Sequence, residues 1–450
     1  MKGMRISSVP GTALALAAAL LAEPRPARGS EADTAAPRGY AVEHYEVELR
    51  LDAAAKRIDG RERLRVRGRS GPVAALRFPL NGLSITTVRG ARKKDLAFAA
   101  TGDRLEITLD PPLARGRATT VEVEYTTSSP KGVVFDAGAV YTIFNTCHWM
   151  VCHEEPGERA TFDLAVLAPK DTEVVASGVP RSKKAEPDGL ERHAWRQRAP
   201  YPTYLFGFAL GPFRRVIERG RPDLELYAPR ELTDEAVRAL FAPTRAMLDF
   251  FRDRAGVSFP HRVYRQVAVE GDAAQEVSSF AILGRRSLEA RLQDPQEDWL
   301  IAHELAHQYW GNLITCADWT HFWLNEGLTT FLVAAYKEQR WGREAYDREI
   351  AICRRRRAIA TEAGFEVPLT FAGEYPSLRV KRAVVYSKGA LFLDALRTVV
   401  GDRTFWAALR RYTRACAGRS VTSRDFQQAF ERESGRDLSD LFATWVYGER

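Results

Sequence analysis

The sequence predicts an α+β protein, with an N-terminal antiparallel β-sandwich domain followed by a mostly α-helical domain. Three observations support this fold class. Apolar and polar residues alternate through much of the first half, apolar residues recur at helical spacing from about Leu232, and the 450-residue chain is longer than one ordinary hydrophobic core requires. We therefore predict two domains, at residues 40–218 and 219–450.

The first domain is predicted from strands that each have one apolar face. Such alternation places one face on a core and the other in water, as in the antiparallel sheets of a sandwich. The dipeptides Asp59-Gly60 and Asn81-Gly82 are predicted as turns between strands. The apolar residues of the alternating segments are Tyr45, Val47, Leu49, Leu51, Leu64, Val66, Leu105, Ile107, Leu109, Val121, Val123 and Tyr125.

The second domain is predicted from helical periodicity, which begins at about Leu232, is clear from Ala236 to Arg252 and dominates to the end of the chain. One helix has marked boundary signals in the segment Asp294–Glu297. Its aspartate can cap the helix, its proline suits the first helical position and its glutamate completes a capping box. We expect this helix to run to Trp310 and to stop at Gly311-Asn312.

The N-terminus has the pattern of a secretory signal peptide, which we assign to residues 1–29, with a linker at 30–39. Lys2 and Arg5 precede an uncharged apolar run over residues 11–22. The run is short for a bilayer span, and no other stretch approaches 18 apolar residues, so we expect export without stable membrane insertion. The exported protein would be periplasmic or secreted. The alternatives are an uncleaved anchor or a wrongly chosen start codon.

The charge of the chain is moderately basic, at a formal +8. A basic protein can bind nucleic acid or an anionic membrane. The basic residues are scattered, however, and form no stripe with interleaved aromatic residues. We interpret the charge as a solvated surface and expect no nucleic-acid partner. The sequence does not determine the oligomeric state.

Cysteines are few, five in all, and cannot all pair with each other. Cys147 and Cys152 are near enough in sequence to form a disulfide in an oxidising compartment. Together with His148 and His153 they could instead form a metal knuckle, although no second ligand pair follows. Free thiols are the third possibility.

The segment His303-Glu304-Leu305-Ala306-His307 contains the strongest chemical signal. Residues at i and i+4 share one helical face, so both imidazoles point to one place, as two ligands of a tetrahedral zinc ion do. Glu304 projects beside them and can reach a water molecule on the metal. The alternative is a core helix whose histidines are satisfied by ordinary hydrogen bonds.

A third ligand is available at Glu326, in the segment Trp323–Gly327 that opens a second helical run. The residues between His307 and Glu326 are enough for a loop and a returning helix. Two histidines and one glutamate leave the fourth position of one zinc ion open, which is the arrangement of catalytic rather than structural sites. The candidate metal ligands are therefore His303, His307 and Glu326.

Longer segments around these residues resemble the M1 family of zinc aminopeptidases, which are gluzincins. The resemblance extends from about Tyr45 to Gly448. It implies a saddle-like N-terminal β domain followed by a thermolysin-like catalytic domain. The segments that carry it are His303–Asn312, Trp323–Gly327, Val385–Ala390, Ala160–Leu164, Tyr204–Ala209 and Asp437–Phe442 with Trp445.

The resemblance also implies catalytic roles. Zinc would polarise the scissile carbonyl and lower the pKa of its water to about 7. Glu304 would accept the proton of that water and pass it to the leaving amine. By resemblance, the hydroxyl of Tyr386 would donate to the oxyanion of the tetrahedral intermediate.

The sequence departs from the family pattern in three places. Family members use a glutamate upstream of the zinc helix to bind the free amino group of the substrate, and here Gln275 or Glu276 occupies that place within Gly271–Ser279. No helper glutamine appears near Thr142-Ile143-Phe144. Val333 stands where an acidic residue commonly supports the metal ligands, so we expect a different arrangement around them.

The chain also stops at the catalytic domain, so we expect an open cleft that admits longer peptides. These features predict a zinc-dependent peptidase that acts on peptides, most simply an aminopeptidase. A zinc endopeptidase is the alternative within enzymes. A catalytically degenerate peptide-binding protein is the alternative outside them, with a basic RNA-binding surface as a distant third.

Overall fold

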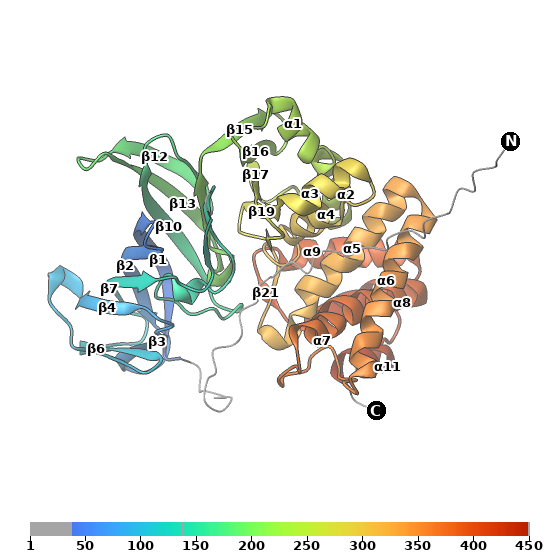
Figure 1. Cartoon of the computed structure of the whole chain (residues 1–450). Coiled ribbons are helices and arrows are strands. Elements are labelled where there is room, and N and C mark those ends of the chain that lie inside the picture. The colour runs from blue at the N-terminus through green and yellow to red at the C-terminus, as the bar shows by residue number, and fades with distance from the viewer. Residues whose placement is uncertain (1–37, 137, 449–450) are drawn as a thin grey trace.

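The computed structural model describes residues 38–136 and 138–448. The predicted signal peptide and nearly all of the predicted linker lie outside these residues. Figure 1 shows a β-rich first part, coloured blue to green, beside a helical second part, coloured orange to red. No helix in the described part of the chain combines the length and apolar character that crossing a bilayer requires.

The first part consists of three sheets around one core. Its largest sheet has seven strands in the order β12-β13-β10-β1-β2-β7-β4, beside the three-stranded β3-β6-β5 and the four-stranded β11-β14-β9-β8. The strands are β1 (Tyr40–Asp52), β2 (Arg57–Gly68), β3 (Val73–Pro79), β4 (Ser84–Arg89), β5 (Phe98–Thr101), β6 (Arg104–Leu113), β7 (Ala118–Ser128), β8 (Val133–Phe135), β9 (Val140–Thr142), β10 (Arg159–Pro169), β11 (Glu173–Ala176), β12 (Val179–Ala185), β13 (Leu190–Pro202) and β14 (Phe208–Gly211).

The predicted alternation is confirmed by burial along these strands. Tyr45, Val47 and Leu49 of β1 are buried in a core shared by the sheets, while the intervening side chains are exposed or half-buried. The prediction of purely antiparallel sheets is wrong at one pair, because β1 and β10 run parallel. Parallel neighbours need a long crossover, and here the chain between them forms strands of all three sheets.

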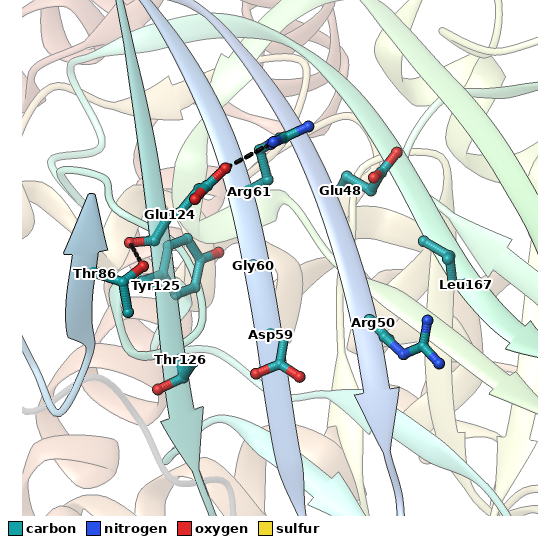
Figure 2. A pocket seen from close by; sticks show the side chains of 10 residues that line it. All are labelled: Glu48, Arg50, Asp59, Gly60, Arg61, Thr86, Glu124, Tyr125, Thr126 and Leu167. Carbon is teal, nitrogen blue, oxygen red and sulfur yellow. Dashed lines mark hydrogen bonds and ion pairs between the residues drawn. The ribbon is translucent and has the colours of Figure 1, made fainter. Parts of the chain in front are cut away.

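One predicted turn is wrong and one is confirmed. Asp59-Gly60 lies inside β2, whereas Asn81 and Gly82 form a turn with positive φ angles of 43° and 82°. Gly60 suits the strand because the Tyr125 ring lies against it, and a Cβ there would come within 2.2 Å of that ring. Figure 2 shows this part of the sheet, with Arg61 paired to Glu124 beside the glycine.

A five-stranded sheet follows, in the order β15-β16-β17-β19-β18. Its strands are β15 (Phe213–Glu218), β16 (Asp223–Pro229), β17 (Val263–Val269), β18 (Ala274–Gln275) and β19 (Phe280–Gly284). The expectation that helices dominate from Leu232 onward missed the last three, because β19 is buried on both faces and shows no alternation. The predicted domain boundary at residue 218 falls between β15 and β16, which pair with each other.

Helices make up most of the remaining chain. Pro243 separates α1 from α2 within the stretch of helical spacing, since proline offers no backbone N–H to continue a helix. The helices are α1 (Asp234–Leu240), α2 (Thr244–Ala255), α3 (Arg285–Gln293), α4 (Trp299–His307), α5 (Trp323–Trp341), α6 (Arg343–Glu362), α7 (Leu378–Arg382), the π-helical turn η5 (Ala383–Lys388), α8 (Gly389–Val400), α9 (Asp402–Cys416), α10 (Ser423–Ser434), α11 (Ser439–Phe442) and the π-helical turn η6 (Ala443–Tyr447).

The predicted bounds of the motif-bearing helix are wrong at both ends. Helix α4 begins at Trp299, five positions after the predicted cap, and ends at His307 rather than Trp310. Asp294 instead follows α3, and its side chain accepts a hydrogen bond from the Gln296 amide at 2.9 Å, which closes a tight connection between the two helices. The prediction that Asp294 caps this helix is therefore wrong, because its side chain serves the connection between α3 and α4.

The two candidate disulfide cysteines are buried free thiols in this structure. The Cys147 thiol donates to Glu154 at 2.9 Å and accepts from Asn81 at 3.0 Å. The metal-knuckle alternative is not supported in the described part of the chain. The His153 ring stacks on Phe78, with centroids 4.7 Å apart, and the one metal-compatible group there lies elsewhere.

Tyr204 joins the first part of the chain to the helical part. Its hydroxyl donates to the Gly311 carbonyl at 3.1 Å and lies 2.8 Å from the Thr315 hydroxyl. The Asn325 side chain donates to the same hydroxyl at 3.0 Å. One phenol from the β part thus connects the chain after α4 to the start of α5.

We predict that Tyr204→Phe destabilises the protein by about 1–3 kcal/mol, because buried groups on Asn325 and Thr315 lose their partner. Denaturant unfolding monitored by circular dichroism measures the change. Tyr336→Phe is the matched control, since its buried hydroxyl has no hydrogen-bond partner within the described residues. Equal stability of the two variants would contradict the role given to Tyr204.

Candidate active site

The three predicted ligands converge between α4 and α5. His303 and His307 lie one turn apart on α4, and their Nε2 atoms are 3.1 Å apart. The Glu326 Oε2 atom, from the first turn of α5, lies 3.2 Å from the His303 Nε2 and 3.3 Å from the His307 Nε2. All three side chains are buried. The structure therefore brings together residues that the sequence separates by a loop.

These distances fit a tetrahedral metal site. Ligand atoms at about 2.0–2.1 Å from zinc in tetrahedral geometry are about 3.3–3.4 Å from one another. The three atoms form a triangle with edges of 3.1–3.3 Å, which is one face of such a tetrahedron. Within the described residues this is the one group of histidine, cysteine or acidic side chains close enough to share an ion. The fourth position remains for water or substrate.

The charges of the ligands also suit a cation. Burial raises the pKa of Glu326, but His307 and His303 outweigh it and hold that pKa well below its ordinary value. Burial lowers the pKa of His303 to about 4. For His307, burial lowers the pKa while Glu326 outweighs it and raises it to about 10. The buried carboxylate thus stays ionised and requires positive charge beside it, which a divalent ion supplies.

The ligand rings are oriented by their neighbours. The His307 Nδ1 atom lies 3.1 Å from the Trp310 carbonyl, which leaves Nε2 for the metal. The His303 ring is stacked on Trp299, with centroids 4.3 Å apart, and its Nδ1 atom has no hydrogen-bond partner within the described residues. Val333, at the position where the family commonly has an acid, is fully buried. On the Nδ1 side, the His303 ring is therefore oriented by packing against Trp299 rather than by a hydrogen bond to a carboxylate.

Glu304 lies on α4 between the two histidines and is 3% exposed. Its Oε2 atom is buried without a hydrogen-bond partner in the part of the chain that the structure describes. Burial raises the pKa of Glu304 well above its usual value, and the carboxylates of Glu276 and Glu326 add to this effect against His307. A carboxyl group so placed is suited to exchange a proton with a substrate or a water molecule.

Tyr386 lies in the π-helical turn η5, and its ring is 6.0 Å from the His303 ring in a stacked arrangement. Two glycines bring this turn to the metal ligands. Gly327, directly after Glu326, approaches Gly389 so closely that a Cβ on Gly327 would lie 2.8 Å from the Gly389 Cα. Side chains at either position would push η5 away from α5. The phenol therefore stays beside the ligand group.

The two candidates for amine recognition have different surroundings. Gln275 is buried, and its Oε1 accepts from the Phe144 amide at 2.9 Å while its Nε2 donates to the Tyr204 carbonyl at 3.4 Å. Its amide thus connects β18 to the first part of the chain. Glu276 is also buried, and its charge acts on both Glu304 and His307. Of the two, Glu276 is the residue whose charge acts on the groups of the site.

The family of this chain is indicated by comparison with known proteins. The family described as "Peptidase family M1 domain" matches residues 241–445, which contain the three ligands together with Glu304 and Tyr386. The second part of the chain is a peptidase family M1 domain.

Relatives of the M1 domain include several peptidases. The chain is 26% identical over 439 residues to leukotriene A-4 hydrolase from Xenopus laevis, an alignment that covers 88% of this chain and 68% of that protein. It is 26% identical over 313 residues to glutamyl aminopeptidase from Bos taurus, covering 66% of this chain and 32% of that protein. The chain thus spans about a third of the length of the second relative.

Solved structures show the same fold around an M1 domain. The M1 zinc metallopeptidase from Deinococcus radiodurans matches with a TM-score of 0.76 and 25% identity, covering 91% of this chain and 94% of that chain. A second structure of that protein contains a bound Tyr-Ser-Ala substrate and matches with a TM-score of 0.76 at 24% identity. The similarity covers the β part as well as the M1 domain.

Three supporting residues of the M1 domain were not singled out from the sequence. Gln308 donates to the Val277 carbonyl at 3.1 Å and accepts from the Ser279 amide at 3.2 Å. Asn312 donates to the Glu276 carbonyl at 2.9 Å. Asn325 accepts from the Cys316 amide at 3.1 Å, next to Glu326. All three lie inside the motif segments, so polar residues flanking the ligands were the available signal.

We predict that Glu326→Gln reduces bound zinc from about one ion per chain to a small fraction, because the site loses its only anionic ligand. Elemental analysis of the purified protein measures the metal content. Thermal unfolding with and without a chelator provides the second measurement. The wild-type protein should unfold at a lower temperature in chelator, and the variant should not respond. Full zinc occupancy of the variant would contradict the ligand assignment.

Proposed function

We propose that this protein is a zinc-dependent aminopeptidase that releases N-terminal residues from peptides. The observation that carries the proposal is the buried triangle of His303, His307 and Glu326. Beside it, the Glu304 Oε2 atom has no hydrogen-bond partner among the residues that the structure describes. Membership of the M1 domain family and the fold shared with zinc metallopeptidases support it. A peptide is the substrate that this machinery suits, because every group has a task in amide hydrolysis.

Glu304 and Tyr386 have different roles in the proposed reaction. When bound, zinc polarises the scissile carbonyl and lowers the pKa of water. The Glu304 carboxylate accepts a proton from the attacking water and later donates it to the leaving amine. The Tyr386 hydroxyl donates to the oxygen of the former carbonyl as negative charge develops there. Glu304 and Tyr386 come from different elements, α4 and η5.

Glu276 gives the reaction its preference for chain ends. A buried carboxylate gains from an ammonium partner, and the free N-terminus of a peptide supplies one. The backbone of Glu276 is fixed by Asn312 from the end of the zinc motif, so its position is tied to the metal ligands. The amino group held there places the first peptide bond of the substrate at the metal.

We predict that Glu304→Gln keeps zinc but lowers kcat by about 10²–10⁴-fold, the usual contribution of a positioned general base. Release of the fluorophore from aminoacyl amides measures the rate, and elemental analysis measures the metal. A rate within a factor of two of wild type at full zinc content would remove Glu304 from its role.

We predict that peptides with a blocked N-terminus are cleaved at least about 10-fold less efficiently than free ones, and that Glu276→Gln loses about 10- to 100-fold in kcat/KM on free peptides, as expected for a charge-assisted hydrogen bond. Matched peptides with free and acetylated N-termini test both statements. Glu270→Gln, at a nearby carboxyl that is 56% exposed, is the control and should behave as wild type. Equal cleavage of free and acetylated peptides would favour an endopeptidase.

We also propose that the protein is exported. Lys2, Arg5 and the apolar run over residues 11–22 support this proposal, and they lie outside the described residues. N-terminal sequencing of the protein purified from its natural host tests it. A mature protein that still begins at Met1 would contradict cleavage.

A further inference from the structure

Ser279 has a backbone conformation that a residue with a side chain disfavours. Its φ angle is 74°, in the left-handed region where glycine is the usual residue. It is the third residue of a four-residue turn, which is closed by a hydrogen bond from the Phe280 amide to the Val277 carbonyl at 3.1 Å. A turn with positive φ at that position normally has glycine there. The serine costs free energy in this place, so contacts around it must hold the turn.

The Ser279 side chain makes two hydrogen bonds to a single residue of the β part, Gly178. Its Oγ atom accepts from the Gly178 amide at 2.9 Å and donates to the Gly178 carbonyl at 3.3 Å. Gly178 lies between β11 and β12 with a φ of 91°, and a Cβ there would come within 2.2 Å of the Arg196 carbonyl oxygen. The neighbouring strands therefore fix Gly178. A glycine at position 279 would suit the turn but would lack the hydroxyl that reaches Gly178.

Arg265 joins the same two residues. Its backbone amide donates to the Ser279 carbonyl at 3.3 Å, and its guanidinium donates to the Gly178 carbonyl at 3.1 Å. The guanidinium also donates to Glu225 at 2.7 Å, and this carboxylate balances the buried charge of Arg265. Two side chains thus join the turn to the β part, and of these only Ser279 belongs to the turn itself.

The backbone of the turn is also held by the end of the zinc motif. Gln308 accepts from the Ser279 amide at 3.2 Å and donates to the Val277 carbonyl at 3.1 Å. Glu276 directly precedes the turn, and Asn312 donates to the Glu276 carbonyl at 2.9 Å. The backbone that carries Glu276 therefore keeps its position relative to α4 only while the turn keeps its shape.

We propose that Ser279 is a positioning residue for recognition of the substrate amino group. Its hydroxyl holds the left-handed turn against Gly178, and the turn sets the position of Glu276 relative to the metal ligands. This proposal rests on the proposed aminopeptidase function and extends it, because amine recognition then depends on a contact between the β part and the M1 domain. Peptides with a free N-terminal ammonium group are the substrates affected, since only they carry the group that Glu276 binds.

The test compares wild type, Ser279→Gly, Ser279→Ala and Ser177→Ala on Leu-Ala-Ala and its N-acetyl form. Ser279→Gly removes the hydroxyl and permits the positive φ without strain, whereas Ser279→Ala removes the hydroxyl and keeps the strain. Ser177→Ala is the matched control. Its hydroxyl is also buried and lies 3.4 Å from the Leu205 and Gly207 carbonyl oxygens, to which it donates, so it has no contact with the turn. Each protein gives one ratio of kcat/KM for the free and the acetylated peptide.

We expect Ser279→Gly to lower kcat/KM for the free peptide by about 10-fold, mainly through KM, because the amino group loses a correctly placed charge-assisted hydrogen bond. Ser279→Ala should lose at least as much. Cleavage of the acetylated peptide by Ser279→Gly should stay at the wild-type rate with full zinc content, so the ratio falls. Ser177→Ala should keep the wild-type ratio. The proposal is overturned if the Ser279→Gly ratio stays within a factor of two of wild type, or if Ser177→Ala lowers the ratio equally.

Binding separates this proposal from the function on which it rests. Zinc-loaded Glu304→Gln protein, with and without Ser279→Gly, can be titrated with both peptides by calorimetry without turnover. A preference for the free amine that is lost with Ser279→Gly supports the proposal even if wild type cleaves neither peptide, a result that counts against the peptidase alone. A preference that persists undiminished overturns the role of Ser279 alone. Equal affinity for both peptides in both backgrounds overturns it together with amine recognition by Glu276.

Discussion

The buried triangle of two imidazoles and one carboxylate is the constraint on which the rest of the structure depends. An ionised carboxylate in the interior is costly unless a cation lies beside it, and Glu326 is 2% exposed. The fold brings α4 and α5 together at a spacing that fits one metal ion, and the approach of Gly327 to Gly389 then sets Tyr386 beside it. The packing of the helical core therefore also determines the geometry of the metal site.

The β part of the molecule supports that arrangement from outside. Tyr204 connects the chain after α4 to the start of α5, and Gln275 ties the strand before Glu276 to the Phe144 amide. Arg159 adds a third connection, since its guanidinium donates to the carbonyls of Asn312 and Leu313 directly after the zinc motif. These contacts join segments that are far apart in the chain. They explain why an M1 domain is accompanied here by a large β structure that supplies none of the proposed ligands.

Much of the fold and of the site could be predicted from local patterns. Alternation through Tyr45, Val47 and Leu49 identified strands because exposure on one face leaves a period of two. The strand β19 is buried on both faces and its sequence does not alternate, so the five-stranded sheet was not predicted. The predicted start of the motif-bearing helix was also wrong, because capping residues do not show which helix they belong to. Asp294 was predicted to cap the motif-bearing helix, but it follows α3 and closes the connection between α3 and α4.

The sequence alone determined the chemistry: spacing on one helix face pairs His303 with His307, and Glu304 must then project beside them. It also indicated Glu326 and, through resemblance, Tyr386. The tertiary structure decided which residues from separate elements come together, which local spacing does not specify. It gave Gln275 a supporting role, through the hydrogen bond from the Phe144 amide, and brought the charge of Glu276 to act on Glu304 and His307. The physical reason is that helix periodicity determines only which residues are neighbours within about one turn. Contacts and charges across the site depend instead on how separate elements pack.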